Sequence, residues 1–164
     1  MADLPGLLEG AHLNHGLGHS FLRHIERTKL LLLVADINGF RLSPQHQFRS
    51  CIETVMLLNR ELELYDETLL NKPALLVINK LNVAGSENIY KDVLEQVHNL
   101  EEFVDSVPEE IKPKNVIKFA KVFGISANEG PAAVVELKQV IKDMMGEINV
   151  DESSLDDYEE NAAK

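Results

Sequence analysis

Several residue types are scarce in this sequence, and each scarcity excludes a class of protein. Cys51 is the one cysteine and tryptophan is absent, so an intrachain disulfide and a multi-cysteine metal site are excluded and a reducing compartment fits. Acidic residues outnumber basic ones, and the formal net charge of -11 argues against a main surface that clamps nucleic acid. The longest apolar run, residues 30–35, is far shorter than the roughly 20 residues of a membrane helix. We therefore expect no membrane span.

The residues that are present are typical of one folded domain. Hydrophobic residues make up 45% of the 164 residues and charged residues 26%, close to the averages for globular domains. Acidic side chains are concentrated near the end of the chain, where the composition favours disorder. We expect a folded domain over residues 1–146 and an acidic, disordered tail over residues 147–164. The opening residues resemble neither a secretory signal nor a transit peptide.

Apolar runs of strand length alternate with amphipathic helical patterns along the chain. Strands are expected at residues 30–35, 74–78 and 117–125, because continuous apolar runs are typical of parallel strands covered on both faces. This alternation predicts an α/β fold, a three-stranded parallel sheet with helices on both faces. Helices are expected at residues 18–28, 86–103 and 131–145, and Gly146 should end the last one. A further long helix should begin at Ser43-Pro44. Its buried stripe is formed by Phe48, Ile52, Val55, Met56 and Leu62.

Ligands of such folds bind beyond the carboxyl ends of the strands. The residues that follow the three expected strands are therefore the first candidates for a binding site. They are Asp36, Asn79-Lys80 and Ser126-Ala127.

Three short motifs, together with a Gly-rich segment, carry a resemblance to a known family. Asp3-Leu4-Pro5-Gly6, Asn79-Lys80 and Ser126-Ala127 stand in the order and approximate spacing of three GTPase motifs. With residues 3–11 and 16–28 they resemble the signature of the Obg family, within the TRAFAC class of P-loop GTPases, and a narrower likeness is to a vertebrate branch of it. The resemblance implies a partial P-loop GTPase (G domain) fold over residues 1–146 that binds GTP or GDP with Mg²⁺.

The resemblance also implies roles on the phosphate side of the nucleotide. Asp3 would contact Mg²⁺, directly or through water, since a hard cation prefers oxygen ligands. Leu4 and Pro5 lie within the same motif, and Gly6 would offer its backbone N–H to the γ-phosphate, where a side chain would block close approach. Leu7 occupies the place of the glutamine that orients water in Ras-like enzymes, so the catalytic residue is unknown.

On the base side, Asn79 and Lys80 would shape the nucleoside pocket, and Ser126 and Ala127 would complete it, with the Ala127 N–H bonding the guanine oxygen. The family pattern is Asn-Lys-x-Asp, yet the fourth position here is Asn82. The aspartate accepts charge-assisted hydrogen bonds from guanine, each worth about 1.5–3 kcal/mol. An asparagine offers one oxygen and a competing donor, so GTP should bind more weakly and xanthine relatively better.

A second departure is the absence of a Gly-x-x-x-x-Gly-Lys-Ser/Thr loop, which holds nucleotide phosphates in this class. As written, the chain is expected to be a truncated G domain that does not hydrolyse GTP alone. The strand that precedes Asp3 in a G domain is also missing, so one flank of the sheet should be exposed.

Two hypotheses for function follow. The first is a GTP-binding switch in assembly of the large ribosomal subunit, with a ribosomal particle or rRNA as partner of the parent protein and the nucleolus, nucleus or mitochondrion as its location. The second is a non-catalytic interaction module of G-domain shape that binds a ribosomal or protein partner. An unrelated α/β regulatory domain is a weaker third. Metal binding by His12, His15, His19 and His24 is disfavoured, because these side chains fall inside the family signature.

Overall fold

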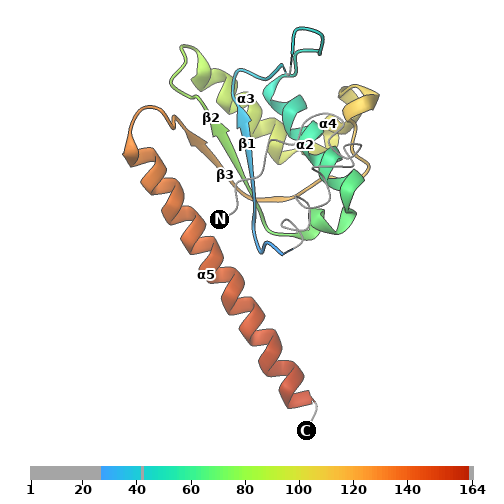
Figure 1. Cartoon of the computed structure of the whole chain (residues 1–164), viewed down its shortest axis with the longest axis vertical. Coiled ribbons are helices and arrows are strands. Elements are labelled where there is room, and N and C mark those ends of the chain that lie inside the picture. Colours follow the sequence, from blue (N-terminus) through green and yellow to red (C-terminus); the bar gives the residue numbers. More distant parts are fainter. Residues whose placement is uncertain (1–26, 42, 163–164) are drawn as a thin grey trace.

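The computed structural model describes residues 27–41 and 43–162, with side chains up to residue 148. Its centre is a three-stranded parallel sheet in the order β1-β2-β3, which confirms the predicted fold class (Figure 1). The strands are β1 (Leu31–Asp36), β2 (Ala74–Asn79) and β3 (Phe119–Ile125). β1 and β2 agree closely with the predicted runs, while β3 starts later than residue 117.

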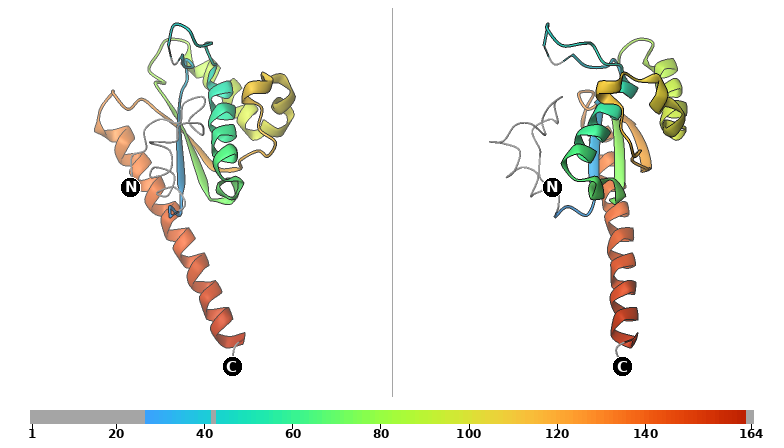
Figure 2. Two further views of the ribbon diagram at one scale, coloured as in Figure 1. Left: turned by 45° about the vertical axis from the view of Figure 1, so that its right-hand side comes forward. Right: turned by 90° about the vertical axis from the view of Figure 1, so that its right-hand side faces the viewer.

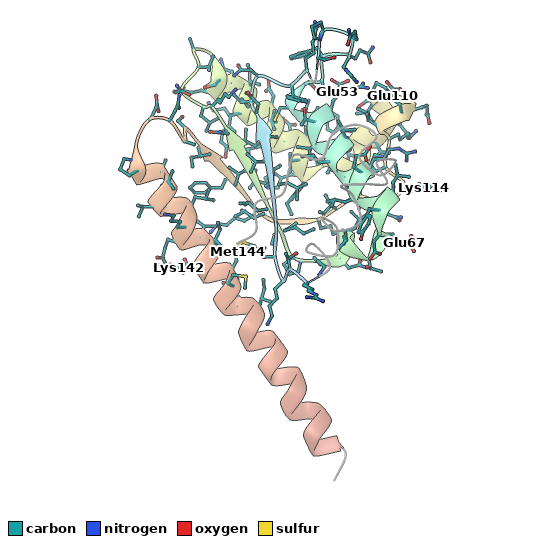
Figure 3. All side chains as sticks on the ribbon, viewed as in Figure 1. Glu53, Glu67, Glu110, Lys114, Lys142 and Met144 are labelled. Atoms are coloured by element: carbon teal, nitrogen blue, oxygen red, sulfur yellow. The ribbon has the colours of Figure 1, made fainter. Side chains whose placement is uncertain are left out.

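Helices cover both faces of the sheet, as the alternating pattern predicts. α2 (Cys51–Tyr65) and α3 (Ser86–His98) pack on one face, in a core that includes Leu76 and Ile78 of β2. α5 (Pro131–Ala162) packs on the other face, against Leu75 and Val77. Met144 lies on the side of α5 next to the strands, and Lys142 on the opposite side (Figure 3). β2 is therefore buried on both faces because its successive side chains enter different cores.

β1 lies at the edge of the described sheet. Within the described residues it pairs with β2 alone, in parallel register from Leu31 opposite Ala74 to Asp36 opposite Asn79. Leu31, Leu33 and Ala35 are buried under α2, whereas Val34 is 53% exposed on the other face. Among the described residues, no strand pairs with the other side of β1, the flank that the sequence predicts to be exposed.

α2 begins later than predicted, and the expected start at Ser43-Pro44 is wrong. Its N-cap is Ser50, whose side chain accepts from the Glu53 N–H while the Glu53 carboxylate accepts from the Ser50 N–H. This reciprocal capping box is a strong start signal. Phe40 and Arg49 form an antiparallel bridge, and the His46 N–H donates to the Ser43 carbonyl in a turn between them. Phe48, expected in the buried stripe, is 51% exposed.

The two later helices also differ from prediction. The single helix expected over residues 86–103 is broken at Asn99, whose side chain caps the Glu95 carbonyl, and α4 (Leu100–Phe103) follows. α5 continues past Gly146, so the predicted stop there is wrong. Its distal half, which includes residues 147–162 of the stretch assigned to the acidic tail, projects beyond the sheet (Figure 2). The remaining elements are the short 3-10 helices η2 (Glu67–Asn71), η3 (Val104–Ser106) and η4 (Glu109–Ile111).

One face of α2 holds the segment that leads into β3. The buried Asn59 side chain donates to the Asn115 carbonyl at 2.9 Å and accepts from the Ile117 N–H at 2.7 Å. One turn along, the Glu63 carboxylate accepts from the backbone N–H groups of Lys114 and Asn115. These bonds satisfy backbone groups that have no strand partner, and they set where β3 begins.

Candidate functional site

The polar residues that follow the strands meet at one edge of the sheet, as expected. Asp36 lies opposite Asn79 in the β1–β2 register, and Asn79 lies opposite Ile125 in the β2–β3 register. Lys80 and Ser126 come directly after these positions. The carboxyl ends of all three strands point toward this edge (Figure 1). It is the position at which open α/β sheets bind ligands.

The Asn79 side chain joins the two loops on which the base-side motifs lie. Its Oδ1 accepts from the Lys80 N–H at 2.8 Å and from the Ala127 N–H at 3.1 Å. Asn79 thereby acts as a bracket between the loop after β2 and the loop after β3. The Ala127 N–H, which the resemblance assigns to a guanine oxygen, is donated to Asn79 here. A ligand carbonyl would have to share or displace that bond.

Lys80 has an unusual backbone. Its φ of 69° makes it the one non-glycine residue with positive φ in the described part of the chain. That region is disfavoured for side chains with a Cβ, and such residues cluster at functional sites. The Lys80 ammonium forms an ion pair with the carboxylate of Asp36, with 2.5 Å between Nζ and Oδ2. The Lys80 side chain is 57% exposed and that of Asp36 22%.

Asp36 uses its second oxygen separately. Oδ1 accepts from the Asn38 N–H at 2.9 Å and from the Asn38 side-chain amide at 3.2 Å. Partial burial by itself would raise the pKa of the Asp36 carboxyl, but the hydrogen bonds from Lys80 and Asn38 and the lysine charge together hold that pKa below its usual value. Asp36 is therefore an ionised anchor at the end of β1.

The loop after Lys80 is held by backbone bonds and by one buried serine. The Leu81 N–H donates to the Ile125 carbonyl at 3.3 Å, and the Ser86 hydroxyl donates back to the Leu81 carbonyl. Ser86 is buried, whereas Asn82 is exposed at the turn. The loop thus has a fixed base and presents Asn82 outward.

Gly124 of β3 packs closely against the same loop. A Cβ at this position would lie 2.5 Å from Leu81 Cδ1 and 2.8 Å from Tyr90 Cζ. Sequence reasoning missed Gly124 and Ser86 as supporting residues. An isolated glycine inside a strand signals a close approach and could have revealed Gly124, while Ser86 has no comparable signal.

The phosphate-side candidates Asp3, Leu4, Pro5 and Gly6 lie outside the described residues. In the part of the chain that the structure describes, no group of three or more His, Cys, Asp or Glu side chains could hold a metal ion. No helix there is both long and apolar enough to cross a bilayer. A cavity of about 440 Å³ lies at the opposite end of β3 from Ser126, between that strand and the segment joining α3 to α4.

Comparison with known proteins gives both a family match and named relatives. Residues 1–80 match the family MMR_HSR1, described as 50S ribosome-binding GTPase. The chain is 44% identical over 147 residues to "GTP-binding protein 10" of Homo sapiens, covering 90% of this chain and 38% of that protein. It is 50% identical over 127 residues to "GTP-binding protein 10 homolog" of Drosophila melanogaster, covering 77% of this chain and 33% of the relative.

A bacterial relative is more distant but aligns over more of the chain. It is "GTPase Obg" of Ruminiclostridium cellulolyticum, 35% identical over 156 residues, which are 93% of this chain and 31% of that protein. The chain spans between about a third and two fifths of the length of these curated relatives.

Proposed function

This chain belongs to the Obg-type family of GTPases, and from that premise we propose that it binds guanine nucleotides at the carboxyl edge of its sheet. The observation that carries the proposal is the Asn79 bracket, which holds Lys80 and Ala127 together through one side-chain oxygen. A nucleoside site of this kind needs both loops in a fixed relation, because the base touches each of them.

The described residues fit the base side of a nucleotide. The Lys80 stem is exposed and fixed at its backbone, and Asn82 projects from an anchored turn. Ser126 and Ala127 lie on the loop after β3, which the Asn79 side chain joins to the loop after β2. The bound nucleotide would supply its own phosphate charge, and Mg²⁺ would neutralise part of it. Asp3 is assigned to that ion, with Leu4, Pro5 and Gly6 beside the phosphates.

Asn82 adds an expectation about base preference. Its amide presents one acceptor oxygen and an NH₂ donor, whereas guanine offers two donors to the family aspartate. The donor suits the oxygen that xanthine carries in place of the guanine amine. The affinity for XTP relative to GTP should therefore be higher in this chain than in the Asn82→Asp variant.

Titration calorimetry of the folded chain with GDP, GTP and XTP in Mg²⁺ tests the proposal. Asn79→Ala removes the bracket, and Asn88→Ala on the exposed surface of α3 is the matched control. We expect binding that Asn79→Ala weakens about tenfold, the equivalent of about 1.4 kcal/mol, and that Asn88→Ala leaves unchanged. A folded chain that binds none of the three nucleotides would refute the proposal.

We further propose that the protein acts as a nucleotide-dependent switch in assembly of the large ribosomal subunit. The description of the matching family, 50S ribosome-binding GTPase, supports this role. Co-sedimentation of the chain with purified large subunits, with GTP or GDP and without nucleotide, is the test, and binding should depend on the nucleotide. A nucleolar, nuclear or mitochondrial location is the matching proposal, to be checked by microscopy of the tagged protein.

A non-catalytic interaction module is the second candidate, and the outer edge of β1, which pairs with no strand within residues 27–41 and 43–162, favours it. Val34 is exposed beside that edge, and an unpaired edge strand is a template for another chain. This candidate predicts co-sedimentation with large subunits that is the same with and without nucleotide. Substituting Val34 by lysine would then abolish the binding, while Asn79→Ala would not.

A further inference from the structure

The ion pair between Asp36 and Lys80 joins two strand ends that no sequence motif connects. One carboxylate oxygen of Asp36 lies 2.5 Å from the lysine ammonium, and the other accepts two hydrogen bonds from Asn38. The two oxygens therefore have separate partners. The Asn38 bonds orient the carboxylate, and this orientation directs Oδ2 at the lysine.

Lys80 is consequently held at both ends. Its backbone N–H is bound by the Asn79 side chain, and its ammonium is held by Asp36. A lysine stem is long and flexible and loses much rotamer freedom when it is held in one position. An exposed lysine without a partner would sample many positions, so the partner decides where the stem lies.

We propose that Asp36 is a positioning residue for nucleotide binding, which holds the Lys80 ammonium at the end of β1 so that the lysine stem lies along the base site. This inference rests on the proposed nucleotide-binding function. Asp36 acts through Lys80 and does not itself touch the nucleotide. The carboxylate also neutralises the ammonium locally, so Lys80 contributes an apolar surface to the base more than a free charge.

A double-mutant cycle separates this role from a direct one. Asp36→Asn should weaken binding of GDP about fivefold to tenfold, in line with loss of a charge-assisted contact. In a Lys80→Met background, which keeps an apolar stem without the ammonium, the same substitution should have no further effect. Asp36→Glu, which restores a carboxylate, should recover part of the affinity.

The chain offers a matched control on another part of the fold. Asp105 forms an ion pair with Lys112 at 2.6 Å, on the segment beside α2 rather than at the strand ends. Asp105→Asn removes an exposed ion pair of the same kind, and nucleotide affinity should not change. A general effect of net charge would instead change the GDP affinity of Asp36→Asn and Asp105→Asn by the same factor.

A second measurement does not depend on nucleotide. Carbon NMR of the Asp36 carboxyl across a pH titration should give a pKa below the ordinary value, and Lys80→Met should raise that pKa. A pKa unchanged by Lys80→Met would mean that the pair is absent in solution and would overturn the inference.

The outcomes distinguish this inference from the proposed function. If the folded chain binds no nucleotide, both fall, even where NMR detects the ion pair. If GDP binds and Asp36→Asn binds it equally well or more tightly, only the positioning role falls. Tighter binding would mean that Asp36 competes with the nucleotide for Lys80.

Discussion

Replacing Asn59 by alanine would remove two hydrogen bonds that join α2 to the segment leading into β3. The Ile117 N–H is fully buried and would lose its acceptor, which costs about 1–3 kcal/mol. The Asn115 carbonyl is partly buried and would lose its donor, at about 0.5–1.5 kcal/mol. Together they predict a loss of about 1.5–4.5 kcal/mol, a large fraction of the 5–15 kcal/mol typical of a domain.

Urea unfolding followed by circular dichroism measures this loss as a lower midpoint at unchanged slope. Glu63→Ala is the matched control, since it removes bonds from the same helix to the same segment, but these bonds are exposed (Figure 3 labels Lys114, one of their donors). Water can replace exposed bonds, so Glu63→Ala should cost about 0.5–1.5 kcal/mol. The reasoning fails if Asn59→Ala costs no more than Glu63→Ala.

Three further predictions concern the site and its supports. Gly124→Ala should lower the free energy of unfolding by about 1–3 kcal/mol through overpacking against Leu81 and Tyr90. In the same urea assay, adding Leu81→Ala should recover part of that loss. Additive effects of the two substitutions would contradict the contact. Ser50→Ala should cost about 1 kcal/mol by removing the cap of α2, a loss that Ser50→Asp, which keeps a capping oxygen, should largely avoid. Burial, with a smaller effect of the Asp36 charge, raises the pKa of Cys51 to about 12. Iodoacetamide at pH 8 should therefore label the Cys51 thiol only when urea unfolds the chain. Labelling of the native chain at the rate of a free thiol would argue against burial.

Much of the fold could be predicted because β1 and β2 are continuous apolar runs of strand length. A parallel strand covered by helices on each side reads as a continuous apolar run, and β1 and β2 appear as such runs that end at Asp36 and Asn79. The ends of these apolar runs in turn predicted which polar residues lie at the carboxyl ends of the strands. The base-side candidates Asn79, Lys80, Ser126 and Ala127 therefore meet where the pattern placed them.

The helix boundaries were less predictable because two local signals compete. Ser43 and Ser50 are both residue types that cap helices, but only Ser50 has a glutamate three positions later. The bridge between Phe40 and Arg49 holds the residues between them out of the helix. Gly146, a frequent helix terminator, lies instead within α5, where backbone bonding continues. A glycine weakens a helix without ending it.

The sequence by itself determined the order of strands and helices, the apolar faces, and the residues at the strand ends, because these depend on local pattern and periodicity. Only the tertiary structure decided which of those residues contact one another. Asp36 and Lys80 meet because β1 and β2 pair in one register, and Asn59 reaches Ile117 across 58 positions of chain. Such contacts depend on how strands pair and helices pack, and no local pattern encodes that geometry.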